Sequence, residues 1–114
     1  MISIQAADPT RMPESCTLPT SERPLRVAEF DTLFRTAVTG QQRMAATVLE
    51  LSLTSEPEVA AAAAALAVRE SLCCSFFRFA LTVDPREVQL TVRVPETHAD
   101  VLDAVAERVA AAMA

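Results

Sequence analysis

The order of periodic segments within Thr47–Val94 is the feature that most constrains how this chain can fold. Along Thr47–Leu53 apolar residues alternate with more polar ones, which is the period of a half-buried strand. An alanine-rich run over about Glu56–Cys74 has the length and spacing of a helix. Two further alternating runs, Phe77–Val83 and Val88–Val94, are joined by an Asp-Pro-Arg turn. The segment therefore predicts strand, helix, strand, strand.

A strand, a crossover helix and a hairpin can share one sheet in few ways. The right-handed crossover rule makes the first two strands parallel, and the hairpin lets the third strand lie between them, antiparallel to both. We predict an α+β fold of order α-β-α-β-β-α. Its three-stranded sheet is a split βαβ unit with the third strand central, and the helices pack on one face.

The sequence also contains signals for where the three predicted helices begin or end. Apolar residues spaced by three and four predict a first helix from Pro24, and Gly40, the only glycine, predicts its left-handed C-cap. Ser55 to Glu58 reads as a capping box with proline in the first turn of the second helix. Thr97 predicts the cap of a last helix, whose apolar stripe is Leu102, Val105, Ala106 and Val109.

Length and charge limit the domain count and the partners. The chain of 114 residues fits one domain. We predict a flexible leader at 1–14 and a single α+β metal-binding domain at 15–114. A net charge of −5 argues against binding of nucleic acid by this chain alone. The sequence shows no signal peptide and no uncharged apolar run near the ~18 residues of a membrane span, which predicts a cytoplasmic protein.

The outer face of the predicted sheet is polar. It carries Glu50, Arg78, Thr91 and Arg93, so it would stay in water or form a modest interface, for example in a homodimer. Arg78 and Arg93 could recognise an anion there. Cross-strand pairing of these arginines with Glu50 is the favoured use.

The three cysteines are the main candidates for chemistry. An odd number cannot form a complete set of disulfides, and Cys73 and Cys74 are adjacent. In a reducing cytosol such thiols are more naturally metal ligands, or small buried apolar groups, than bridges. Cys16 precedes the first helix, and the eight residues to Pro24 can extend about 25 Å. It can therefore reach the cysteine pair, although nothing requires it to.

Other polar groups surround the cysteine pair. Glu70 precedes Cys73 by one helical turn, and connectivity puts His98 at the same edge of the sheet. Three converging thiolates would suit mercury, lead or trivalent arsenic, and His98 as a fourth ligand would give a zinc site. The negative helix end and Glu70 disfavour a thiolate without a metal, whereas a bound cation supplies the missing positive charge.

The segment Glu70-Ser-Leu-Cys-Cys-Ser-Phe-Phe77 resembles a group of small actinobacterial proteins with a Glu-x-x-Cys-Cys-x-Phe motif, found alone or beside heavy-metal (mercury-type) resistance regulators. The stretch from Cys16 to Asp31 is similar to the opening of those proteins. This resemblance implies binding of a heavy metal or metalloid through Cys16, Cys73 and Cys74, with Glu70 in support. A separate regulator would then have to read DNA.

Three functions remain open from the sequence. The leading hypothesis is noncatalytic binding of a soft ion of the mercury, arsenic or lead type, with zinc possible, for sequestration, transfer or sensing. The first alternative is a thiol-dependent detoxification enzyme that acts on a metal or metalloid compound, with Cys73 or Cys74 as nucleophile and Glu70 as proton donor. The second is an interaction module whose cysteines only pack.

Overall fold

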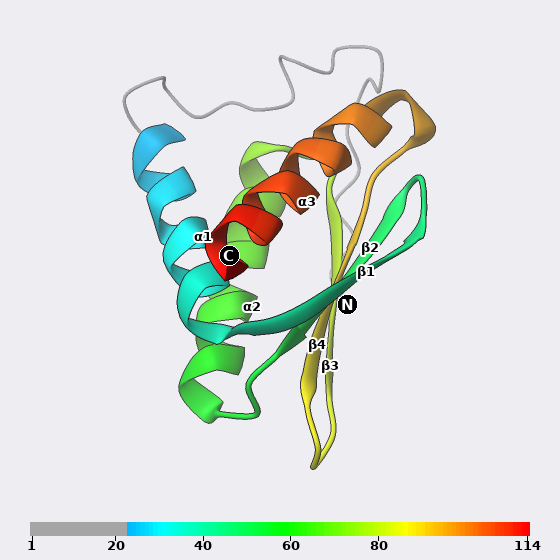
Figure 1. Cartoon of the computed structure of the whole chain (residues 1–114). Coiled ribbons are helices and arrows are strands. Elements are labelled where there is room, and N and C mark those ends of the chain that lie inside the picture. The colour runs from blue at the N-terminus through cyan, green and yellow to red at the C-terminus, as the bar shows by residue number, and fades with distance from the viewer. Residues whose placement is uncertain (1–22) are drawn as a thin grey trace.

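The computed structural model describes residues 23–114, and their side chains from residue 28 on (Figure 1). The predicted leader at 1–14 and the candidate ligand Cys16 lie outside the described residues. The described part is an α+β fold of three α-helices and one four-stranded sheet. Its elements are α1 (Arg23–Ala37), β1 (Val38–Ala45), β2 (Val48–Leu53), α2 (Pro57–Cys73), β3 (Arg78–Val83), β4 (Val88–Arg93), the 3₁₀ turn η2 (Glu96–His98) and α3 (Ala99–Met113).

The sheet has the order β1-β2-β4-β3, and all neighbouring strands are antiparallel. Strand β4 lies between β2 and β3, which is the predicted place of the hairpin's second strand. The predicted number of three strands is wrong, because β1 adds a fourth strand at the edge beside β2. The sequence of β1, Val-Thr-Gly-Gln-Gln-Arg-Met-Ala, has no apolar alternation that would mark it as a strand.

Gly40 is the second correction. It lies within β1, and among the described residues no glycine has a positive φ, so it is not the left-handed cap of α1. A Cβ atom at this position would meet nothing within 4 Å. The pairing register shifts between Val38 and Gly40, which marks an irregularity where the chain leaves α1 and enters the edge strand directly.

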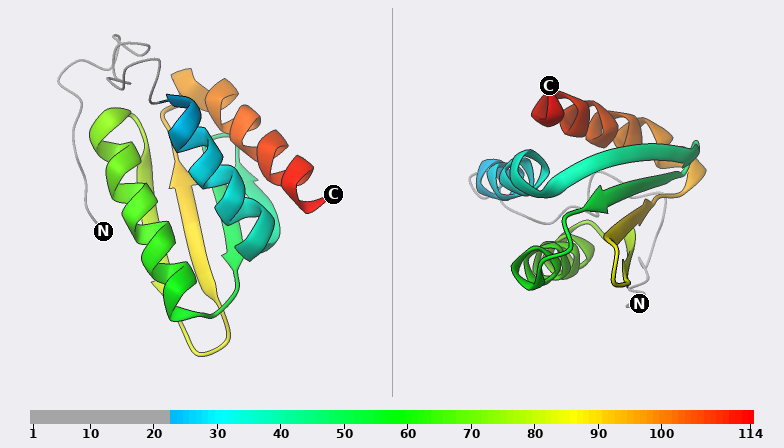
Figure 2. Two further views of the ribbon diagram at one scale, coloured as in Figure 1. Left: turned by 90° about the vertical axis from the view of Figure 1, so that its left-hand side faces the viewer. Right: turned by 60° about the horizontal axis from the view of Figure 1, so that its bottom comes forward.

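The three helices cover one face of the sheet, with α1 between α2 and α3 (Figure 2). The side chains that point toward them from the two inner strands are at most 3% exposed: Leu49, Leu51, Leu53, Val88, Leu90 and Val92. From the helices, Leu33, Phe34, Leu66, Leu102 and Val109 complete the core. The predicted arrangement of helices on a single face is therefore confirmed.

Two predicted helix caps are wrong in detail. Helix α2 does begin with Pro57 in its first turn, but its N-cap is Glu56, and no side chain caps it. Ser55 is thus not the cap. Helix α3 follows η2 with His98 at the N-cap, again with no side-chain cap hydrogen bond. The hydroxyl of Thr97 instead lies 2.9 Å from Nδ1 of His98.

Polar contacts tie α3 to its neighbours. Gln41 of β1 donates to the carbonyl of Ala106 at 3.1 Å, and Arg43 forms an ion pair with Asp103 at 2.8 Å. Arg108 donates to both carboxylate oxygens of Asp31 in α1, and these hydrogen bonds raise the pKa of Arg108. These contacts fix α3 over the β1 side of the sheet.

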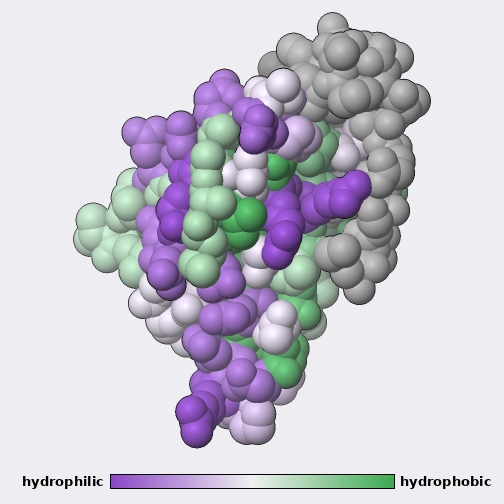
Figure 3. All heavy atoms as spheres, turned by 90° about the vertical axis from the view of Figure 1, so that its right-hand side faces the viewer, coloured by the Kyte–Doolittle hydropathy of each residue, from purple (hydrophilic) through white to green (hydrophobic). Residues whose placement is uncertain are grey.

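In the part of the chain that the structure describes, no helix covers the opposite face of the sheet. Figure 3 looks onto this side and shows mainly hydrophilic side chains with smaller apolar areas between them. Its residues include Glu50 and Ser52 of β2 and Gln89, Thr91 and Arg93 of β4, as predicted from the strand period. No helix in residues 23–114 combines the length and the apolar character that a membrane crossing requires.

The core makes a direct stability prediction. Leu102 is 0% exposed, so Leu102→Ala should lower the free energy of unfolding by about 2–5 kcal/mol, through lost burial and the cavity left behind. Leu72 on α2 is 61% exposed, and Leu72→Ala should change it by no more than about 0.5 kcal/mol. Urea unfolding measures both. Equal losses for the two variants would contradict the packing described here.

Candidate functional site

The two adjacent cysteines lie where α2 ends. Cys73 is the last residue of the helix, and Cys74 is its C-cap, with φ −121° and ψ 87°. The N–H of Cys74 donates to the carbonyl of Glu70 at 2.6 Å, which closes the last helical turn. Cys74 is 6% exposed and belongs to the hydrophobic core, whereas Cys73 is half-buried at its border. The two sulfur atoms therefore occupy different environments.

Their oxidation states also differ. Cys74 is disulfide-bonded, and Cys73 carries a thiol. The sequence favoured thiols over a bridge at this pair, so the structure differs from that expectation at Cys74. A disulfide has no charge, which suits a sulfur atom buried among apolar groups better than a thiolate does.

The electrostatic field at this end of α2 is negative. The last carbonyls of a helix carry the negative end of its dipole, and the last turn of α2 has no basic residue to offset it. Glu70 adds a carboxylate one turn earlier. A metal ion bound by sulfur at this place would add a positive charge beside the negative helix end.

His98 lies close to the segment that follows the cysteines. Its ring stacks on Phe76 with centroids 4.4 Å apart and an interplanar angle of 29°, and the residue is 5% exposed. Phe76 is only two residues beyond Cys74, so the end of α2 and the start of α3 meet, as predicted. Sequence analysis missed Phe76 as the contact residue, although the Phe76-Phe77 pair marks the place.

These groups do not form a closed metal site by themselves. Within residues 28–114, no three His, Cys, Asp or Glu side chains lie close enough together to hold a metal ion. Cys73, Cys74 and His98 thus do not make such a group as the structure stands. The remaining predicted ligand, Cys16, lies outside the described residues, so the predicted set of three thiolates stays a prediction.

Glu70 also contributes to an apolar cavity. It lines a small apolar cavity of about 150 Å³ between the helices and the sheet, beside four phenylalanines: Phe30, Phe34, Phe77 and Phe79. Neither Cys73 nor Cys74 lines this cavity. The proton-donor role that the enzyme hypothesis gives to Glu70 therefore gains no support from a shared pocket.

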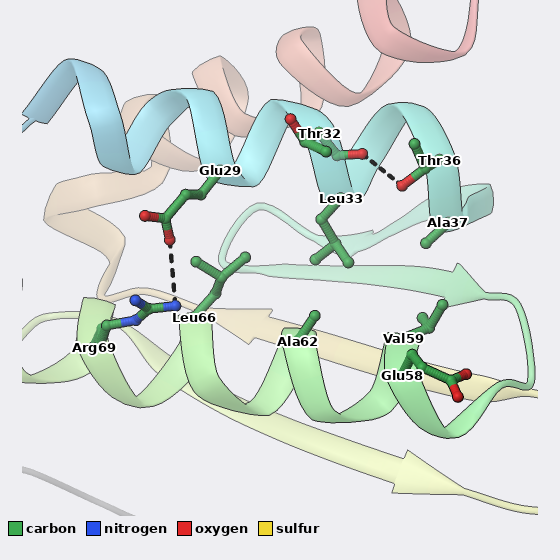
Figure 4. Close-up of a pocket in the computed structure, with 10 residues that line it drawn as sticks. All are labelled: Glu29, Thr32, Leu33, Thr36, Ala37, Glu58, Val59, Ala62, Leu66 and Arg69. Atoms are coloured by element: carbon green, nitrogen blue, oxygen red, sulfur yellow. Dashed lines mark hydrogen bonds and ion pairs between the residues drawn. The ribbon is translucent and has the colours of Figure 1, made fainter.

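A second cavity of about 460 Å³ opens between α1 and α2 (Figure 4). Leu33 and Leu66 point into it from opposite helices, and an ion pair from Arg69 to Glu29, at 3.2 Å, crosses one end. Ala37 and Ala62 make it wide, because small side chains leave space between the helices. Its lining contains no Cys or His, so it adds nothing to the thiol site.

Comparison with known proteins gave no assignment. No protein-family model, curated protein or solved structure matches the chain. The case for function therefore depends on the chemistry of the chain's own residues.

The different states of the two cysteines predict opposite results in a thiol titration of unreduced, unfolded protein. Cys73→Ser should lower the number of reactive thiols by one, because it removes a thiol. Cys74→Ser should raise the number by one, because it releases the sulfur atom to which Cys74 is bonded. Ser75→Ala is the matched control and should change nothing. A loss of one thiol in both cysteine variants would show that Cys74 is reduced.

Proposed function

We propose that the reduced protein binds a soft metal or metalloid ion through the thiolates of Cys73 and Cys74, with Cys16 as the third ligand. One observation carries this proposal: two adjacent cysteines lie at the negative end of α2, whose last turn holds no basic residue. A soft cation both neutralises that field and prefers thiolate sulfur. Binding of this kind requires no catalytic group.

The disulfide of Cys74 supports the choice of Cys16. The chain has three cysteines, and Cys73 is not disulfide-bonded. We propose Cys16 as the partner of Cys74, because it is the one cysteine that remains. A disulfide needs Cα atoms within about 7 Å of each other, so this pairing would put Cys16 beside the site. Reduction by a dithiol would then give three neighbouring thiols, and a metal ion would displace their protons.

The surroundings favour ligation by sulfur alone. His98 is stacked on Phe76 and contacts Thr97, which suggests a structural use for its ring. We therefore propose an ion of the mercury, arsenic or lead type rather than zinc held by three cysteines and His98. Sequestration, transfer or sensing would all use such a site. With a net charge of −5, a sensing role would need a separate regulator to contact DNA.

The test is a titration of the fully reduced protein with mercury(II), followed by thiolate-to-metal absorbance in the ultraviolet. Wild type should bind one ion per chain, and Cys16→Ser, Cys73→Ser and Cys74→Ser should each weaken binding, because each removes one sulfur ligand. His98→Ala and Ser75→Ala should match wild type. The unreduced protein should bind less mercury, because its Cys74 sulfur is held in the disulfide.

A different result would favour the interaction module. Cys74 is buried in the hydrophobic core, which is what a packing role predicts. Under that function Cys16→Ser would leave mercury binding unchanged, and the remaining thiols would react as independent groups without a shared absorbance band. Zinc binding that His98→Ala abolishes would instead favour the four-ligand site.

A further inference from the structure

Two arginines face each other at one end of the outer sheet face. Arg78 is the first residue of β3, Arg93 is the last of β4, and the two are direct partners in the antiparallel pairing. Side chains at such positions start about 5 Å apart, and like charges placed directly opposite destabilise a sheet. Both arginines are exposed, so each guanidinium can turn toward a ligand.

Within residues 28–114, no acidic side chain forms an ion pair with either arginine of this pair. The sequence favoured pairing with Glu50, but Glu50 lies opposite Gln42 and Thr91, and no ion pair joins it to either arginine. Within the described residues neither guanidinium has an ion-pair or hydrogen-bond partner. By contrast Arg43, Arg69 and Arg108 each bind a carboxylate. In a chain with more acidic than basic residues, two opposed arginines without a carboxylate leave a local positive charge.

The arginines line a cavity of about 310 Å³ whose lining also includes four apolar residues. Phe76 and Val94 are buried there, and Pro95 and Val48 extend the apolar wall. Thr47, in the turn just before β2, adds a hydroxyl group to the lining. The cavity thus pairs two positive charges and a hydroxyl with a hydrophobic surface of similar extent.

We propose that this cavity, named here the arginine cavity, binds a small organic acid. Arginine binds planar oxyanions through two parallel hydrogen bonds, and two arginines on adjacent strands can hold one carboxylate from two sides. The apolar body of the ligand would lie against Val48, Val94 and Pro95, where a simple inorganic anion has nothing to contact. This site shares no residue with the proposed thiol ligands, so either proposal can fail without the other.

The test uses benzoate as the probe, with its neutral isostere benzamide and with inorganic phosphate for comparison, all at constant ionic strength. Chemical-shift changes in two-dimensional NMR spectra should localise to Thr47, Phe76 and Val94. Benzoate should bind at least about tenfold more tightly than benzamide, because only benzoate forms charge-assisted hydrogen bonds. It should also bind more tightly than phosphate, which lacks an apolar body.

Variants separate this site from general charge effects. Arg78→Gln and Arg93→Gln should each weaken benzoate binding about tenfold or more, whereas Arg86→Gln, in the exposed turn at the other end of the same hairpin, should leave it unchanged. Without ligand, either of the first two variants should raise the melting temperature by about 1 to 5 °C, since it removes the opposed charges. Equal affinity for benzoate and benzamide, phosphate binding as tight as benzoate, or equal loss in all three variants would overturn the proposal.

Discussion

The whole structure depends on the burial of one sheet face. Strands β2 and β4 put six aliphatic side chains on this face, each at most 3% exposed, and the three helices cover them. An antiparallel sheet can be covered on one side and remain wet on the other. Because of this asymmetry, the two candidate binding sites lie at the end of a helix and on the outer face of the sheet.

The end of α2 illustrates how burial and charge act together. The helix must stop where the chain turns into β3, and its final carbonyls leave a negative field around Cys73 and Cys74. Cys74 enters the core there, and Cys73 stays at its border. In the structure the two sulfur atoms take two different forms, a disulfide at Cys74 and a thiol at Cys73.

The outer sheet face uses the opposite sign of charge. At the end where β3 begins and β4 ends, Arg78 and Arg93 oppose each other above the apolar residues Phe76 and Val94. Phe76 also stacks on His98, which joins this end of the sheet to the start of α3. The proposed cation site and the proposed anion site thus both lie beside the connection between α2 and β3. They differ in charge and in the kind of ligand that they would bind.

The sequence by itself determined the α+β class, the pairing of β4 with both β2 and β3, and the single face covered by helices, because each of these follows from strong local periodicity and chain connectivity. It could not reveal β1, whose residues show no alternation and become a strand only because β2 offers an open edge. The local patterns also predicted caps at Ser55 and Thr97, whereas the N-caps are Glu56 and His98. Only the tertiary structure showed that Glu70 lines an apolar cavity and that Glu50 forms no ion pair with Arg78 or Arg93. Side-chain partners of this kind depend on strand register and helix rotation, which no local pattern encodes.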